Sequence, residues 1–224
     1  MIPLRSTERV HAATAVTGIL IAINVLIFLY QFSMDQSAVT LFDERWGLVP
    51  DAISGNLQTL LTSMFLHGSW LHLLGNMLFL WVFGRNVEDL IGGGRFLVLY
   101  LCCGLAAAIL QVVTNPYSRV PTIGASGAIA GVMGAYLIKF PRARIVTLVL
   151  FVIFFTTIEI PAWAMLIWWF VIQLFSGLGS LASTDYSGGG IAWFAHVGGF
   201  VAGMLLIRVF PVKRRQWRAW HEEE

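Results

Sequence analysis

Apolar residues occur along the chain in long runs, and the charged residues stand between these runs. Seven runs contain no Asp, Glu, Lys or Arg, at residues 10–34, 52–84, 96–118, 120–138, 145–158, 160–184 and 186–207. A helix that crosses a membrane needs about 20 mainly apolar residues, and six of the runs are long enough. We predict membrane spans at about 12–32, 65–84, 96–115, 121–139, 162–182 and 191–209. The short run 145–158 is predicted to be a re-entrant or interfacial segment.

The basic residues favour six spans with both termini on the inner side. With the N-terminus inside, only Arg45 and Arg119 of the 14 Lys and Arg residues fall on the outer side. Loops on the cytoplasmic side carry an excess of Lys and Arg, so this distribution is the expected one. A seventh span would move the basic segment 213–218 outside. We therefore predict a multi-pass protein of a cell membrane, such as the bacterial inner membrane, with cytoplasmic N- and C-termini.

The amino-acid composition is typical of a membrane protein and argues against one class of partner. Apolar residues make up 58% of the chain and charged residues 12%, whereas soluble domains are roughly half apolar and a quarter charged. We predict an all-α fold with a single domain over residues 1–224, a bundle of six transmembrane helices whose first outer connection, 35–64, lies on the membrane surface. The first apolar run is long and lacks a small-residue cleavage site, so no removable signal peptide is expected. No basic stripe with interleaved aromatic residues is present, which argues against nucleic acid as a partner.

Three polar side chains from distant parts of the sequence reach one depth just below the outer surface. Spans two, four and six run in the same direction, and Ser126 lies roughly 9 Å into the fourth at the helical rise. His72 and His196 lie at comparable depths in the second and the sixth. A serine becomes nucleophilic when a base takes its proton, and histidine suits that role. We therefore predict Ser126 as a nucleophile and His196 as its general base.

Small residues surround both of these side chains. Gly127 and Gly131 have GxxxG spacing after Ser126, while Gly199 and Gly203 share the helix face of His196. Such faces allow two membrane helices to pack closely, which would bring the histidine to the serine. Taken alone, a serine in a membrane helix commonly packs or bonds to its own turn, and GxxxG spacing alone indicates only helix association.

Two further polar residues point to the stabilisation of a negatively charged intermediate. His72 and Asn76 are four residues apart and therefore lie on one helix face. Together with the backbone N–H of Ser126, they would form an oxyanion hole, although polar pairs in membrane helices also serve as interhelical contacts. His67, one turn nearer the surface, is expected to be structural or to touch the substrate. No acidic residue lies within the spans near His196, so we predict a dyad rather than a triad.

These motifs, taken together, resemble the rhomboid family of intramembrane serine proteases. The matching segments are HxxxxHxxxN (67–76), GASG (124–127) and AHVGGFVAG (195–203). The resemblance implies that Ser126 is the nucleophile, that His196 is the general base, and that His72 and Asn76 are the oxyanion-hole side chains. Glu88 resembles a structural acidic residue of the family. The implied activity is cleavage of transmembrane protein substrates within the lipid bilayer, near the outer face.

The sequence also departs from the family pattern. Some members carry a tyrosine four residues after the serine that stacks on the histidine, and Ala130 stands at that position here. We therefore expect His196 to be held by Trp193 or by a phenylalanine. The fifth span and the glycine-rich segment 183–190 are the expected lateral gate for the substrate.

Two other functions are compatible with parts of the pattern. A catalytically silent rhomboid-like protein would bind membrane clients without cleaving them, although the intact set of polar residues argues against it. A small transporter would use His72 and His196 as a proton relay, which leaves Ser126 without a role. No HExxH motif or Cys/His cluster is present, so we expect neither a metal nor another cofactor. The sequence does not indicate the substrate or the oligomeric state.

Overall fold

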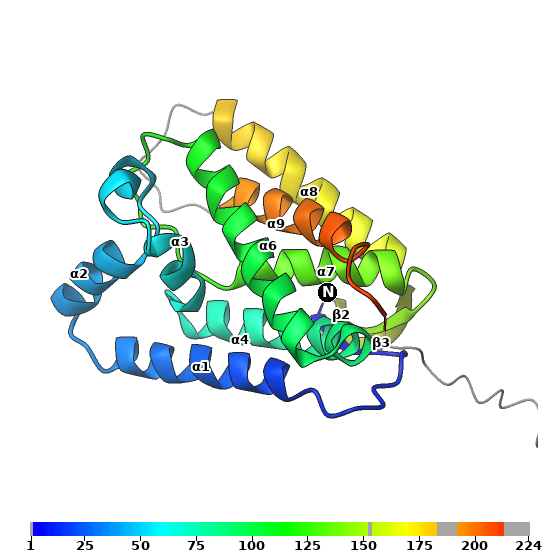
Figure 1. Cartoon of the computed structure of the whole chain (residues 1–224). Coiled ribbons are helices and arrows are strands. Elements are labelled where there is room, and N and C mark those ends of the chain that lie inside the picture. The colour runs from blue at the N-terminus through cyan, green and yellow to red at the C-terminus, as the bar shows by residue number, and fades with distance from the viewer. Residues whose placement is uncertain (1, 152–153, 183–191, 213–224) are drawn as a thin grey trace, which may run out of the picture.

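The computed structural model of the chain describes residues 2–151, 154–182 and 192–212, and it is mostly helical (Figure 1). The α-helices are α1 (Ala15–Phe32), α2 (Gln36–Trp46), α3 (Thr59–Thr62), α4 (Trp70–Phe79), α5 (Arg85–Ile91), α6 (Gly93–Thr114), α7 (Ser126–Lys139), α8 (Ala162–Ala182) and α9 (Trp193–Leu206). Short 3₁₀ turns cover Pro50–Gly55 and Ser63–Phe65, and a π-helical turn covers Leu80–Gly84. The strands are β1 (Ile2–Ser6), β2 (Arg144–Phe151) and β3 (Phe154–Pro161). The segments 183–190 and 213–218, named above as a gate and a basic tail, lie outside the described residues.

Helices occupy the positions where the apolar runs predict spans. Among the described residues, α1 and α6 are long and apolar enough to cross a membrane, whereas α7, α9 and the first part of α8 are shorter apolar helices. The predicted span 65–84 begins later, because Ser69 caps α4 by accepting a hydrogen bond from the backbone N–H of His72. This helix then continues through the π-helical turn into α5.

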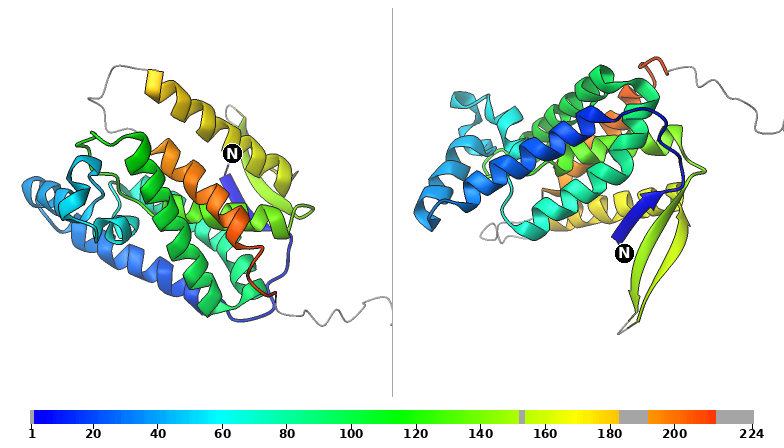
Figure 2. Two further views of the ribbon diagram at one scale, coloured as in Figure 1. Left: turned by 45° about the horizontal axis from the view of Figure 1, so that its top comes forward. Right: turned by 90° about the horizontal axis from the view of Figure 1, so that it is seen from below.

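Helix α7 forms the centre of the bundle. All of its residues from 127 to 136 are buried, which fits a sequence that is apolar on every side. It packs against α6 and α9, while α1 and α8 lie on opposite sides of the bundle (Figures 1 and 2).

Glycine residues allow the backbones of α7 and α9 to touch. A Cβ atom added to Gly199 would overlap the carbonyl group of Gly127, and one added to Gly203 would overlap that of Gly131. No side chain fits between the helices at these points, as the glycine spacing in the sequence predicts. The close approach places the first turn of α9 beside the first turn of α7.

Glu88 joins the start of α1 to α5. Its side chain is buried, and its carboxylate accepts hydrogen bonds from the backbone N–H groups of Val16 and Thr17, at 2.9 and 2.7 Å, and from the hydroxyl of Thr17 at 2.7 Å. The first N–H groups of a helix have no partner within the helix, and a negative charge there is favoured by the helix dipole. This agrees with the structural role that the rhomboid resemblance implies for Glu88.

Replacement of Glu88 by alanine is expected to lower the free energy of unfolding by about 3 kcal/mol, because three buried donors lose a charged acceptor. Thermal or denaturant unfolding in detergent measures this change. Glu88→Gln keeps one acceptor oxygen and should lose less stability than Glu88→Ala. Equal unfolding midpoints for Glu88→Ala and the wild type would contradict this role.

A three-stranded antiparallel sheet makes the prediction of an all-α fold wrong. Its strand order is β1–β2–β3, with Ile145 opposite Ile160 and with a register shift between Pro3 and Arg5 in β1. The run 145–158 is rich in β-branched and aromatic residues, which favour strands, and it is too short to cross a membrane as a helix. Figure 2 shows that the hairpin of β2 and β3 projects from the helices. Its place at the membrane interface stays a prediction.

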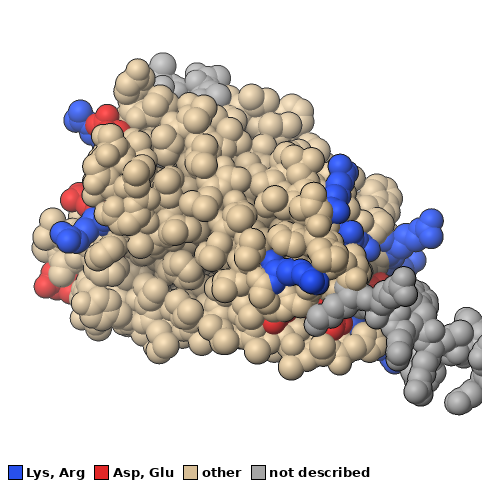
Figure 3. Space-filling view, viewed as in Figure 1, with Lys and Arg blue, Asp and Glu red and all other residues tan. Residues whose placement is uncertain are grey.

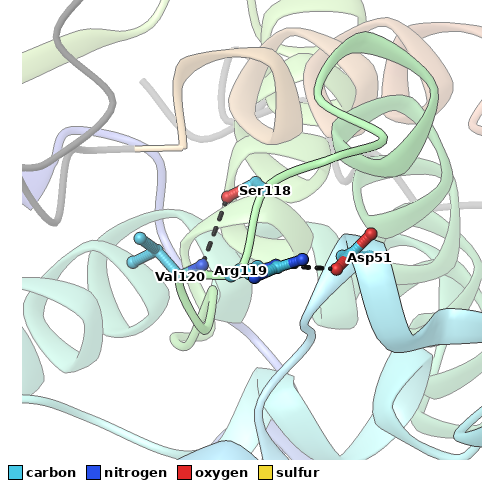
Figure 4. Close-up of polar contacts among 4 residues, drawn as sticks. All are labelled: Asp51, Ser118, Arg119 and Val120. Atoms are coloured by element: carbon cyan, nitrogen blue, oxygen red, sulfur yellow. Dashed lines mark hydrogen bonds and ion pairs between the residues drawn. The ribbon is translucent and has the colours of Figure 1, made fainter.

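The segment 35–64, predicted as the first outer connection, is folded against the segment that leads to α7. Leu48 and Thr122 exchange two backbone hydrogen bonds, of 3.0 and 2.8 Å. The exposed guanidinium of Arg119 donates a hydrogen bond to a carboxylate oxygen of Asp51 at 3.0 Å (Figure 4). Next to it, the backbone N–H of Val120 donates to Oγ of Ser118 at 3.4 Å. Exposed ion pairs add little stability, so residues 120–124 are held mainly by this backbone pairing and by the hydrogen bond of 2.9 Å from the N–H of Gly124 to the carbonyl of Ser63.

Candidate active site

Ser126 begins helix α7 at the end of a tight approach to α4. The preceding Gly124 has a φ of 124°, a conformation that side chains rarely adopt. A Cβ atom on Gly124 would also lie only 2.7 Å from Nε2 of His72. Glycine at this position therefore meets two requirements at once, a left-handed backbone and room for the imidazole of His72.

The structure brings Ser126 and His196 together, although 70 residues separate them in the sequence. The Oγ atom of Ser126 lies 2.8 Å from Nε2 of His196, which is hydrogen-bond distance. His196 projects from the first turn of α9 and is only 8% exposed. Its position depends on the glycine contacts that bring α9 against α7.

Gln173 on α8 determines which nitrogen of His196 carries the proton. Its Oε1 atom lies 2.6 Å from Nδ1 of His196, and both side chains are buried. An amide oxygen only accepts hydrogen bonds, so Nδ1 is the protonated nitrogen of the neutral ring. Nε2 then has its lone pair directed at Ser126 and accepts the hydroxyl proton. This is the tautomer that a general base for Ser126 needs.

Aromatic rings complete the surroundings of His196. Trp169 on α8 lies with its ring centroid 5.7 Å from that of His196, and Trp193 meets the imidazole edge-on at 6.5 Å. Trp193 is one of the contacts expected from the sequence. Gln173 and Trp169 were not among the residues predicted from the sequence, because only serine, histidine and asparagine were taken as polar groups within the apolar runs. Gln173 stands four residues after Trp169, so both occupy one face of α8. A glutamine within a predicted membrane span is costly and therefore indicates a functional residue, so the sequence did contain a signal for Gln173.

Replacement of Gln173 by leucine is expected to lower kcat for a transmembrane substrate on the order of a hundredfold, because Nδ1 of His196 loses its acceptor and the useful tautomer is no longer selected. Cleavage assays with purified protein measure this loss. Gln173→Glu keeps an acceptor oxygen at the same place and should retain more activity than Gln173→Leu. An unchanged kcat in the leucine variant would remove Gln173 from the site.

His72 and Asn76, both on α4, line the same cavity as Ser126 and His196. The cavity has a volume of about 540 Å³ and is also lined by Leu48 and by residues 120–124, which precede α7. Asn76 is 8% exposed, and its Nδ2 atom donates to Nε2 of His67 at 2.9 Å. An asparagine amide carries two N–H donors, so one hydrogen remains for another acceptor. The four side chains predicted from the sequence therefore surround one cavity.

Among the described residues, His72 and His196 are the only ionisable side chains that line the cavity. Small residues of α6 and α7 form much of its wall, among them Gly104, Ala107, Ala108 and Ala128. Within residues 2–151, 154–182 and 192–212, no group of three His, Cys, Asp or Glu side chains is placed to hold a metal ion. The residues present here fit proton transfer between serine and histidine beside neutral hydrogen-bond donors.

Comparison with known proteins identifies the family. A family model described as a rhomboid domain matches residues 54–212. The chain is 46% identical over 83 residues to the Rhomboid protease GluP of Bacillus subtilis (strain 168), which covers 37% of this chain and 16% of that protein. It is 33% identical over 123 residues to the Putative rhomboid protease YdcA of the same organism, covering 54% and 61% of the two chains. It is 30% identical over 163 residues to RHOMBOID-like protein 5 of Arabidopsis thaliana, covering 73% and 43%.

These alignments span less than two thirds of the length of each of the three relatives. Two of the relatives are named as proteases or putative proteases, and one is named as rhomboid-like. The family model covers more than half of this chain, including α4, α7 and α9. The chain therefore belongs to the rhomboid family of membrane proteins.

Proposed function

We propose that this protein is an intramembrane serine endopeptidase that cleaves transmembrane segments of other proteins near the outer face of the membrane. The observation that carries the proposal is the 2.8 Å contact between Oγ of Ser126 and Nε2 of His196. It lies in a cavity that His72 and Asn76 also line. The family relationship to rhomboid proteases supports the same activity.

In the proposed reaction, the hydroxyl of Ser126 attacks the carbonyl carbon of the scissile peptide bond while its proton passes to Nε2 of His196. The carbonyl oxygen becomes an oxyanion that accepts hydrogen bonds from Asn76, His72 and the backbone N–H of Ser126. The imidazolium then returns the proton to the leaving amine, and the peptide C–N bond breaks. Water hydrolyses the acyl-enzyme by the same steps, with His196 taking a proton from the water and giving it to Ser126.

Gln173 contributes to both proton transfers. Its Oε1 atom accepts the Nδ1–H of His196 in the neutral ring and in the imidazolium, so the ring does not rotate as it gains and loses a proton. A neutral amide stabilises the imidazolium less than a carboxylate would. The proposed site is therefore a dyad positioned by an amide, with no carboxylate partner for His196 among the described residues.

The proposal includes six membrane spans with both termini on the cytoplasmic side. Charged side chains gather towards the two ends of the molecule, and a broad surface without them lies between (Figure 3). A surface of this kind suits the hydrocarbon interior of a bilayer. The substrate would enter beside α8, the fifth span, and the sheet of β1, β2 and β3 would lie at the inner interface. The substrates are membrane proteins with a helix that unwinds near its outer end.

Labelling with a serine-reactive fluorophosphonate tests the proposed function. Wild-type protein in membranes should be labelled, and Ser126→Ala should not be. Ser118→Ala, which changes a serine of the connection between α6 and α7, is the matched control and should keep its label. Cleavage of a reporter transmembrane substrate should follow the labelling. Equal labelling of wild type and Ser126→Ala would contradict the nucleophile, and stable client binding without labelling or cleavage would favour a catalytically silent protein.

A further inference from the structure

A chain of hydrogen bonds runs from the outer helix α2 to Asn76. Nε2 of Gln31 donates to a carboxylate oxygen of Asp43 at 2.8 Å, and Oε1 of Gln31 accepts the backbone N–H of His67 at 3.0 Å. The ring of His67 continues the chain, because its Nε2 accepts the Nδ2–H of Asn76 at 2.9 Å. The four residues come from α1, α2, α4 and the segment that precedes α4.

The interior of this chain is closed to solvent. Gln31 and His67 are each 2% exposed, and Asn76 is nearly as buried. Burial raises the pKa of the Asp43 carboxyl above its ordinary value, although the hydrogen bond from Gln31 opposes the rise. Buried polar groups that lose a partner destabilise their surroundings, so each link constrains the next. From the sequence, His67 was expected to be structural or to touch substrate, and neither Gln31 nor Asp43 was given a role at the site.

The direction of each hydrogen bond follows from which of the two groups carries a hydrogen to donate. An ionised Asp43 only accepts hydrogen bonds, so it binds the NH₂ group of Gln31 and leaves the amide oxygen for the N–H of His67. Because Asn76 donates to Nε2 of His67, that nitrogen is an acceptor and the proton of the neutral ring is on Nδ1. The Asn76 amide lies with its Nδ2 atom towards His67, and the hydrogen bond to Nε2 holds it in this orientation.

This orientation matters for the proposed reaction. With Nδ2 held by His67, the second N–H of the same nitrogen is available to an oxyanion in the cavity. A rotated amide would place its oxygen, an acceptor, at the position of Nδ2, where it would repel negative charge. The His67 ring also packs edge-on against the ring of His72, with 5.1 Å between their centroids. His67 therefore contacts both side chains proposed to stabilise the oxyanion.

We propose that His67, Gln31 and Asp43 are positioning residues that hold Asn76 in its donor orientation and couple the outer helix α2 to the active site. The inference rests on the proposed function, because it assigns a purpose to the orientation of an oxyanion-hole residue. A displacement of α2 that separates Asp43 from Gln31 releases the amide of Gln31, and the loss passes through His67 to Asn76. The position of the outer helix thus sets the efficiency of the chemical step.

Kinetics of Gln31→Leu in wild-type and Asn76→Ala backgrounds test this coupling. One oxyanion donor is worth about 10²–10³ in kcat, and loss of its orientation removes part of that. Gln31→Leu should therefore lower kcat about tenfold with little change in KM. In the Asn76→Ala background the same substitution should lower kcat no further, because its effect acts through Asn76. Glu44→Leu, on an exposed neighbour of Asp43 in α2, is the matched control and should leave kcat unchanged.

Unfolding measurements test whether a variant has lost kcat only because its structure is destabilised. If Gln31→Leu lowers the unfolding temperature, Asp43→Leu at the partly exposed end of the chain takes its place, with the same expected pattern. An unchanged kcat in these variants, or a loss that multiplies with that of Asn76→Ala, would overturn the coupling. Cleavage that survives Ser126→Ala would instead overturn the proposed function, so the two failures are distinguishable.

Discussion

Alanine in place of either Ser126 or His196 is expected to lower kcat/KM for a transmembrane substrate by about 10⁴-fold or more. Removal of the hydroxyl takes away the attacking atom, and removal of the imidazole leaves Ser126 with no base at the 2.8 Å distance of Nε2. The two groups act as one unit, so the double variant should be no slower than either single variant. Purified variants in detergent or liposomes, assayed with one reporter substrate, measure these rates.

The same variants report on the structure of the site. Ser126→Ala and His196→Ala remove side chains without altering the glycine contacts that bring α7 and α9 together. Their unfolding midpoints should stay close to that of the wild type, which separates a loss of chemistry from a loss of fold. Cleavage by either variant at the wild-type rate would be incompatible with the dyad. Losses that multiply in the double variant would show that the two residues act independently.

The second large effect is expected at the oxyanion side of the cavity. Asn76→Ala should lower kcat by about 10²–10³ with a smaller change in KM, because a donor that meets the developing negative charge stabilises the transition state more than the bound substrate. Steady-state kinetics with the same reporter separate the two constants. His72→Ala should act in the same direction, because His72 lines the cavity one helical turn from Asn76.

Leu74 offers a control on the same helix. Its side chain is 59% exposed on the surface of α4, and it is not among the residues that line the cavity. Leu74→Ala should therefore keep the wild-type kcat, whereas Asn76→Ala should not. A loss in Asn76→Ala that appears only in KM would assign Asn76 to substrate binding and not to the oxyanion hole.

The geometry around His196 shows which contacts replace the tyrosine that some rhomboid proteins carry. Ala130 is fully buried within α7 and offers no ring to the imidazole. Helix α8 supplies the contacts instead, with Trp169 beside the ring and Gln173 bonded to Nδ1. Because α8 is also the proposed gate, its movement away from α9 would remove the partner of Nδ1. Substrate entry and activation of Ser126 would then be linked through Gln173.

Much of the fold could be predicted because it depends on local sequence. An apolar run of about 20 residues must form a helix within a bilayer, since a backbone in lipid has to satisfy its own hydrogen bonds. The predicted ranges at α1, α6, α8 and α9 therefore differ from the observed helices by only a few residues at each end. The run 145–158 was too short for that rule, and its pairing with the N-terminal strand depends on residues more than 130 positions away.

The sequence by itself determined which polar residues fall at matching positions of their helices and that glycines would let two helices touch, because both follow from the rise and periodicity of a helix. Only the tertiary structure decided which side chains meet across helices. The bond of Gln173 to His196, and the chain from Asp43 through Gln31 and His67 to Asn76, join elements whose rotation and register no local pattern specifies. Helix–helix packing sets those two quantities, and with them the tautomer and the amide orientation at the proposed active site.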